Sequence, residues 1–206
     1  MEKEIENRLL GLESIIHGMY HNLELMKYMS YNLHKDRFNL FNNLGLYWIW
    51  SSLTADQIME FYKIIGKKEK FSFTKIINIS KSFKCDINYE LVEDKKTELK
   101  DEYDKTDFET VRSKYIAHQD LNMPEIKTDL TSISLFTEKA IELYHLFFEE
   151  FKKEKTNFSN DVINSFKEIF DEIDEYDKVK AFLMAAEIEG KDSIEISKLA
   201  EFIKEK

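Results

Sequence analysis

The chain has 206 residues, of which 43% are hydrophobic and 14% aromatic, so it can bury a sizeable core and is not a disordered segment. Five glycines and one proline are too few for an architecture built on many tight β-turns. The net charge of −10 excludes a uniformly basic nucleic-acid-binding surface, and the single Cys85 excludes an intrachain disulfide and a zinc site made of several cysteines.

The N-terminal sequence MEKEIENRLL is charged and lacks the apolar core of a signal peptide. The most apolar stretch, LYWIWSSL, is too short to cross a bilayer. Together with the single cysteine, these features predict a cytoplasmic protein without membrane contact.

Apolar residues recur at spacings of three and four along residues 2–34, which predicts one long helix. Its apolar stripe consists of Leu9, Leu12, Ile16, Met19, Leu23, Met26 and Met29. Asp36 can cap a second helix that ends near Leu53. We expect this second helix to turn Phe38, Phe41, Leu44, Trp48 and Ile49 inward.

Thr54 or Asp56 can cap a third helix, which would end near Ile65. The segment 66–70, GKKEK, reads as a loop. Ser72 or Thr74 can then open a fourth helix.

Residues 87–101 have the composition of a polar helix, and Asp107 can cap a further one that continues to about His118. Pro124 then interrupts the chain, because proline lacks the amide proton that a helix interior needs. Residues 126–153 again have helical periodicity, with Leu130, Ile133, Phe136, Ala140, Leu143 and Phe147 on one stripe.

These elements predict an all-α protein, an antiparallel helical bundle with a small C-terminal helical extension. The core density falls and the charge rises at residues 152–157, so we place the bundle domain at 1–155 and an acidic helical extension at 156–206.

Residues 63–84 contain seven lysines and one glutamate, which makes this segment basic in an otherwise acidic chain. Phe71 and Phe73 lie between the lysines. Because lysines neutralise phosphates and exposed aromatic rings stack on bases, the segment can contact RNA. The predicted RNA-binding residues are Lys67, Lys68, Lys70, Lys75 and Lys114. The alternative is a solvated helix face with its phenylalanines in the core.

The segment 111–120, V-R-S-K-Y-I-A-H-Q-D, is the most informative in the chain. On a helix, Val111 and His118 share a packed stripe and Arg112 flanks it. Arginine can fork onto a phosphate, and histidine can transfer a proton near neutral pH. This pair suits attack by an RNA 2′-hydroxyl on the adjacent phosphodiester. The alternative is structural, with Arg112 paired to Asp120 or to a neighbouring glutamate.

The stretch 112–120 resembles the signature of HEPN proteins, in which an arginine is followed after four to six residues by a histidine. It most resembles the abortive-infection HEPN families, whose wording is close to R-[DN]-K-x-x-A-H-x-D. Ser113 departs from that wording. The matching residues are Arg112, Lys114, Ala117, His118 and Asp120. The preceding segments F-N-L-F-N-N-L-G-L-Y-W-I-W, T-A-D-Q-I-M and F-S-F-T-K-I-I-N-I-S are similar to those families too, so the resemblance covers about residues 1–153.

The resemblance implies a four- or five-helix bundle that forms a homodimer, with the two Arg–His motifs facing each other in one composite cleft. It also implies a toxin or phage-defence endoribonuclease that needs no metal or other cofactor and can pair with a cognate antitoxin. Arg112 would bind the scissile phosphate, and His118 would be the general acid or base. Asp120 and Ser113 would support them. The rival hypothesis is a catalytically silent HEPN module that binds RNA or a partner protein.

His17 and His21 lie one helical turn apart, a spacing that metal ligands also use. Glu13 and Glu24 share their helix face. No H-E-x-x-H pattern accompanies them, so a solvated polar face is the better interpretation and we predict no metal site.

Overall fold

The computed structural model describes residues 2–31, 44–113, 129–156, 158–159, 164–165, 167–169 and 171–172. Regular structure in these residues is entirely helical, as the sequence predicts. The chain divides into two compact units, Met1–Asn160 and Asp161–Lys206. In the second unit, the described residues 164–165, 167–169 and 171–172 are helical. No described helix is long and apolar enough to span a membrane.

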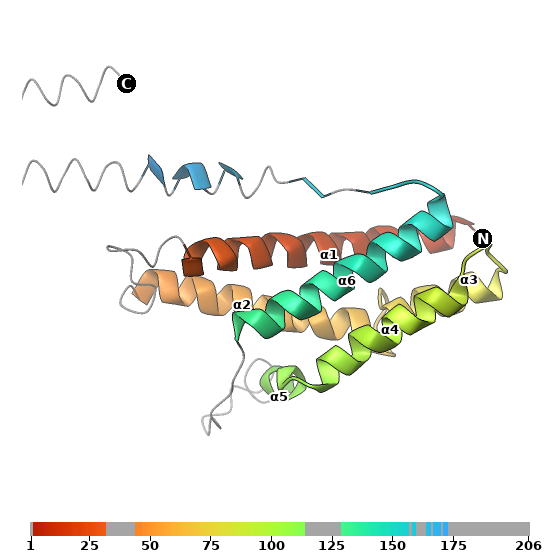
Figure 1. The fold of residues 1–206 in the computed structure, drawn as a ribbon, viewed down its shortest axis with the longest axis horizontal. Helices are drawn as coiled ribbons and strands as arrows, with labels where there is room; N and C mark the ends of the chain where they lie inside the picture. The colour runs from red at the N-terminus through yellow and green to blue at the C-terminus, as the bar shows by residue number, and fades with distance from the viewer. Residues whose placement is uncertain are drawn as a thin grey trace, which may run out of the picture. The chain divides into compact units, whose positions relative to one another are not determined.

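The first helix, α1, extends over Glu2–Tyr31 (Figure 1). All seven apolar residues of its predicted stripe are buried. The stripe therefore faces the core of the first unit, as its periodicity indicates.

The second helix, α2, is continuous over Leu44–Ile65, so the predicted break near Leu53 is wrong. The Thr54 hydroxyl donates to the Trp50 carbonyl at 2.9 Å, one turn earlier, so Thr54 lies within the helix. Asp56 accepts a 2.8 Å hydrogen bond from the Asn22 side chain. Both polar side chains thus have partners that leave the helix intact, which is why neither caps a new one.

The predicted inward orientation of Trp48 and Ile49 is also wrong, since their exposed fractions are 63% and 44%. Trp50 is the partly buried aromatic residue here, and its Nε1 donates to the Ser30 hydroxyl at 3.3 Å. Phe38 and Phe41 lie outside the described residues.

Residues 66–72 connect α2 to α3, Phe73–Ser82, and Ser72 caps α3 by accepting from the Lys75 amide at 3.4 Å. Helix α4, Tyr89–Asp104, is the predicted polar helix and begins after Asn88, whose side chain accepts from the Leu91 amide. The loop at 66–70 and the Ser72 cap are confirmed.

The short helix α5 covers Phe108–Val111. Asp107 precedes it but makes no capping hydrogen bond with its side chain. The Phe108 ring is buried, with ring centroids 5.0 Å from Phe61 and 6.0 Å from Phe136. Burial of this ring therefore fixes the position of α5. Residues 114–128, which include the predicted break at Pro124, lie outside the described residues.

Helix α6, Leu130–Lys152, begins after Asp129, which accepts from the Ser132 amide at 2.6 Å. Leu130 on its predicted stripe is partly buried. The stripe's other five residues, Ile133, Phe136, Ala140, Leu143 and Phe147, are fully buried. This periodicity prediction is confirmed.

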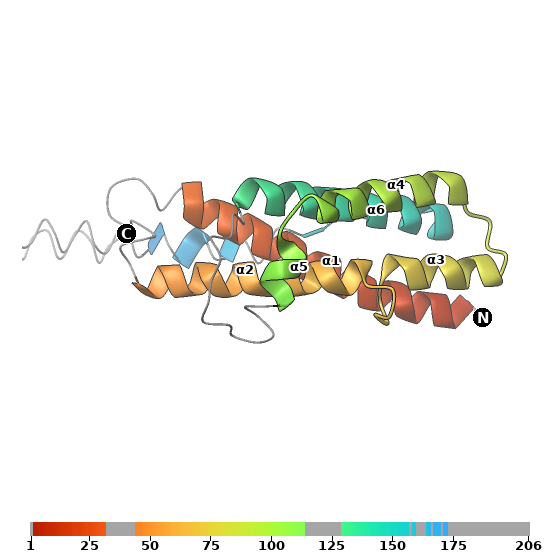
Figure 2. The same cartoon turned by 90° about the horizontal axis from the view of Figure 1, so that it is seen from below.

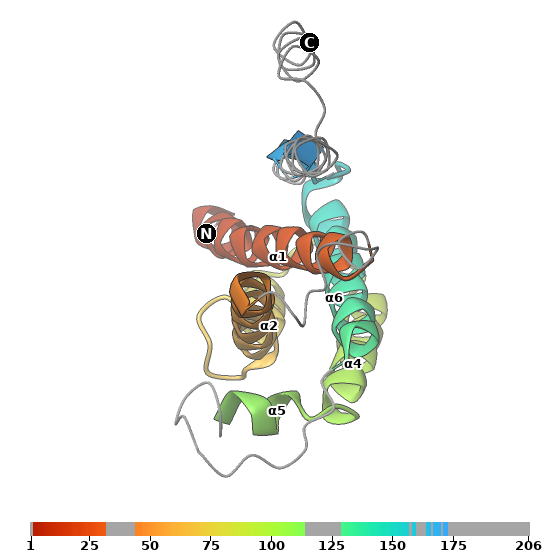
Figure 3. The same ribbon diagram turned by 90° about the vertical axis from the view of Figure 1, so that its left-hand side faces the viewer.

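Helices α1, α2, α4 and α6 run antiparallel to their packing neighbours (Figures 1 and 2). Helix α1 packs on α2 and α6, and α6 also packs on α4. The buried Gln57 side chain joins three of them, because its Nε2 donates to the Met19 carbonyl at 3.1 Å and to the Thr137 hydroxyl at 2.8 Å. Figure 3 shows α2 and α4 apart on the side of the bundle away from α1, with α5 lying across that side.

Candidate functional site

Arg112 follows α5 directly, and 28% of its side chain is exposed. Its guanidinium carbon lies 3.9 Å from the centre of the Tyr62 ring on α2. Its Nη1 lies 3.7 Å from Oε1 of Glu109, one turn earlier in the chain. Stacking on an aromatic ring holds a guanidinium flat without using its hydrogen-bond donors. Arg112 is therefore oriented mainly by Tyr62.

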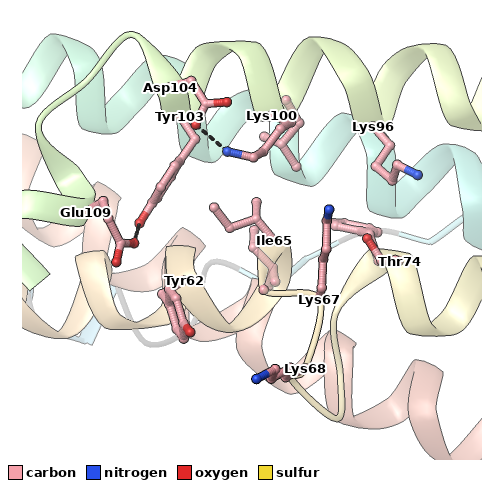
Figure 4. Close-up of a pocket in the computed structure, with 14 residues that line it drawn as sticks. Tyr62, Ile65, Lys67, Lys68, Thr74, Lys96, Lys100, Tyr103, Asp104 and Glu109 are labelled. Carbon is pink, nitrogen blue, oxygen red and sulfur yellow. Dashed lines mark hydrogen bonds and ion pairs between the residues drawn. The ribbon is translucent and has the colours of Figure 1, made fainter. Parts of the chain in front are cut away.

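Glu109 joins Arg112 to Tyr103 at the end of α4. The Tyr103 hydroxyl donates to Oε2 of Glu109 at 2.9 Å, as Figure 4 shows. Burial, and then the hydrogen bond to the Glu109 carboxylate, raise the pKa of the Tyr103 hydroxyl well above its usual range. This hydroxyl thus stays protonated and fixes the position of Glu109.

The Arg112 guanidinium does not use all of its hydrogen-bond donors within the described residues. Its Nε is buried and makes no hydrogen bond to the described residues. The Glu109 contact, at 3.7 Å, is an ion pair longer than a hydrogen bond. Because Nε is buried, the donors that Arg112 can offer to a phosphate are those of its two terminal nitrogens, Nη1 and Nη2.

A cavity of about 600 Å³ opens beside this network, between α2 and α4 (Figure 4). Its walls come from the end of α2, the following loop, the start of α3, α4 and Glu109 on α5. Its lining includes Tyr62, Ile65, Lys67, Lys68, Phe73, Thr74, Lys96, Leu99, Lys100 and Glu109. The volume lies within the range of about 300–1,000 Å³ that is typical of small-molecule sites.

Four of the described lysines line this cavity, and they differ in their partners. On α4, Lys96 binds Glu93 and Lys100 binds Asp104. Lys67 and Lys68, on the loop after α2, are exposed and form no ion pair with the described residues. The loop lysines are the ones whose positive charge is available to a ligand.

Arg112 lies at the edge of the same cavity. Tyr62 and Glu109, the two residues that contact its guanidinium, both line the cavity. A phosphate at Arg112 and a ligand among the loop lysines would therefore be neighbours. This adjacency is a property of the tertiary structure, because Tyr62 and Arg112 are far apart in sequence.

The structure brings together two of the predicted RNA-binding lysines, Lys67 and Lys68, and separates others from them. Lys70 lies over the Phe71 ring, with its Nζ 5.0 Å from the ring centre, and its carbonyl accepts from Arg8. Lys75 is exposed on α3. Neither of these residues lines the cavity.

The supporting residue Ser113 donates its hydroxyl to the Thr110 carbonyl at 3.3 Å, which is a local backbone contact. His118, Asp120 and Lys114 lie outside the described residues. The predicted convergence of Arg112 and His118 on one phosphate stays a prediction.

The comparisons with known proteins give no relative. No protein-family model, no curated protein and no solved structure matches the chain. The functional interpretation therefore depends on the residues of the site and on the sequence resemblance alone.

The histidines of α1 take part in aromatic packing. The ring centroids of His17 and His21 are 5.7 Å apart, and His17 packs edge-on against Phe158 at 4.3 Å. His145 on α6 packs against the same phenylalanine at 5.0 Å. In the described part of the chain, no group of three histidine, cysteine, aspartate or glutamate side chains is arranged to hold a metal ion.

Sequence reasoning missed four residues of the site: Tyr62, Lys96, Lys100 and Tyr103. Glu109 is the neighbouring glutamate that the sequence offers as a partner of Arg112, since a spacing of three residues favours an ion pair on a helix. The four missed residues come from α2 and α4, and only helix packing brings them to Arg112.

Proposed function

We propose that this chain is a metal-independent endoribonuclease of the HEPN toxin or phage-defence type. The observation that carries the proposal is the partly exposed Arg112 guanidinium, stacked on Tyr62 beside a lysine-lined cavity, with a Glu109 contact that is longer than a hydrogen bond. A charged planar fork next to a basic cavity suits a phosphodiester substrate. The resemblance of residues 112–120 to the HEPN signature supports the same substrate class.

The proposed reaction needs no group beyond the RNA and the two motif residues. His118, assigned from the sequence, takes the proton of a 2′-hydroxyl, and the 2′-oxygen attacks the adjacent phosphorus. The bond from phosphorus to the 5′-oxygen breaks, and that oxygen leaves with a proton supplied by the protonated His118 imidazole. Arg112 stabilises the negative charge that develops on the phosphate oxygens. The products are a 2′,3′-cyclic phosphate end and a 5′-hydroxyl end.

We further propose that the active species is a homodimer in the cytoplasm, with one composite cleft and, in its biological setting, a cognate antitoxin. The exposed Trp48 and Ile49 on α2 support the dimer, because large apolar side chains are seldom exposed together without a partner surface. They surround a concavity with Ser52, Leu53 and Asp56.

The rival proposal is a catalytically silent HEPN module that binds RNA or a partner protein. The observation that favours it is the Glu109 carboxylate at 3.7 Å from Arg112, since a negative charge there opposes a phosphate. The structural alternative for Arg112, an ion pair with a neighbouring glutamate, would use the same contact with Glu109.

The deciding experiment is cleavage of end-labelled RNA by the full chain in excess EDTA, with analysis of the product ends. Wild type should cut and leave cyclic phosphate ends. Arg112→Ala and His118→Ala should each lower the rate by about 100-fold or more. Arg112→Lys should also be impaired, because an ammonium cannot form the two-donor fork.

The matched control is Arg8→Lys, the same substitution at an arginine of α1 that lies outside the cavity. It should cut like wild type. Full activity in either alanine variant would remove the catalytic assignment. A wild-type protein that binds RNA tightly but never cuts it would establish the silent module instead.

A further inference from the structure

We propose that the cavity between α2 and α4 binds one nucleotide of a single RNA strand, next to the phosphate at Arg112. This inference rests on the proposed function in one respect, namely that RNA is the ligand. The cavity would be a binding subsite, separate from the groups that do the chemistry.

The apolar part of the cavity suits a nucleobase. Ile65 contributes aliphatic surface to its wall from α2, and the buried side chains of Phe73 and Leu99 lie behind it in the core. A base presents an apolar π-face, and burial of that face against such walls is favourable whatever the base. The cavity volume of about 600 Å³ leaves room for a nucleotide.

The polar part of the cavity suits a phosphate. Lys67 and Lys68 are the lining lysines without an ion pair to the described residues, and Figure 4 shows Lys67 pointing toward α4. Thr74 lines the cavity from the first turn of α3. The Thr74 hydroxyl can donate a hydrogen bond to a phosphate oxygen.

The loop lysines differ in charge from the chain as a whole. The chain has a net charge of −10, whereas its segment 63–84 has seven lysines and one glutamate. The loop lysines belong to this basic segment, and they lie where a cavity is open beside Arg112. An RNA strand that reaches Arg112 has a favourable place for a neighbouring nucleotide at this cavity.

The test is fluorescence anisotropy with the full chain and a labelled 2′-O-methyl RNA of roughly 12 nucleotides, which the proposed reaction cannot cleave. The variant is Lys67→Glu with Lys68→Glu. The matched control is Lys3→Glu with Lys155→Glu, two exposed lysines outside the cavity whose substitution changes the net charge by the same amount. Melting temperatures of all three proteins show that each is folded.

The variant with Lys67→Glu and Lys68→Glu should bind the RNA at least about tenfold more weakly than wild type, with a shallower dependence on salt, because phosphate contacts are lost. The control with Lys3→Glu and Lys155→Glu should bind like wild type. Equal weakening by both variants, or no weakening by the loop-lysine variant, would overturn the subsite.

A competition experiment distinguishes a nucleotide within an RNA strand from a free nucleotide. Adenosine, guanosine, cytidine and uridine 5′-monophosphates should compete only at concentrations far above the RNA, since a single unit lacks the neighbouring contact at Arg112. Competition as strong as that of unlabelled RNA would overturn the strand subsite in favour of a free nucleotide. Because the probe is uncleavable, failure of the nuclease proposal leaves this binding test intact.

Discussion

At the scale of one residue, Glu109 places a negative charge beside Arg112. Removing this charge tests whether Arg112 binds a phosphate. Glu109→Gln keeps an acceptor for the Tyr103 hydroxyl but removes the negative charge 3.7 Å from the guanidinium. We expect the affinity for 2′-O-methyl RNA to rise by about three- to tenfold, because a phosphate at Arg112 no longer meets a carboxylate. Anisotropy measures this change, and a weaker affinity would contradict the assignment of Arg112 as the phosphate-binding residue.

Two glycines of α1 form a matched pair for a test of packing. A Cβ at Gly11 would lie 2.4 Å from the Phe71 ring, whereas a Cβ at Gly18 would meet nothing within 4 Å. Gly18→Ala should raise the free energy of unfolding by about 1 kcal/mol through helix propensity. The free energy of unfolding of Gly11→Ala should be lower than that of Gly18→Ala by about 1–3 kcal/mol, because the Phe71 ring must move to make room for the new methyl group. Urea unfolding of both variants measures the difference, and equal values would show that Phe71 moves without cost.

At the scale of elements, Phe158 anchors the segment that follows α6. Its ring packs against His17 and Tyr20 on α1 and against Tyr144 and His145 on α6. Phe158→Ala should loosen this segment, so trypsin should cut after Lys153 or Lys155 several-fold faster, because the rate follows local opening. A time course with mass spectrometry measures it. Cleavage at an unchanged rate would mean that contacts other than the Phe158 ring hold the segment.

The same packing makes stability depend on pH. Burial, and then the charge of His17, lower the pKa of His21; burial also lowers the pKa of His145, against the opposing effect of Glu149. The unfolded chain therefore binds protons first as the pH falls below the ordinary histidine value of about 6.5. The stability from these neutral imidazoles is full above that pH and is lost below it.

His21→Gln, which cannot titrate, should accordingly show a smaller loss of unfolding free energy between pH 7.5 and 5.5 than wild type does. Urea unfolding at the two pH values measures it. A loss as large as in wild type would show that His21 does not contribute to the pH dependence.

At the scale of the whole molecule, a composite cleft makes activity depend on protein concentration. If two copies form the cleft, the cleavage rate per chain should fall on dilution in step with dissociation of the dimer. Trp48→Ser should shift both curves to higher concentration, since Trp48 is 63% exposed on α2. Sedimentation velocity and cleavage assays measure the two curves, and a constant rate per chain while the dimer dissociates would contradict the composite cleft.

The helical class, the buried stripes of α1 and α6 and the Ser72 cap were predictable from the sequence, because periodicity and capping act between residues close in the chain. The sequence also singled out Arg112 and the loop lysines by residue type. The continuity of α2, the outward orientation of Trp48 and the contacts of Arg112 with Tyr62 and Glu109 beside the cavity were not predictable in this way. Such contacts depend on how α2, α4 and α5 pack, and helix packing joins residues whose separation along the chain leaves no local pattern.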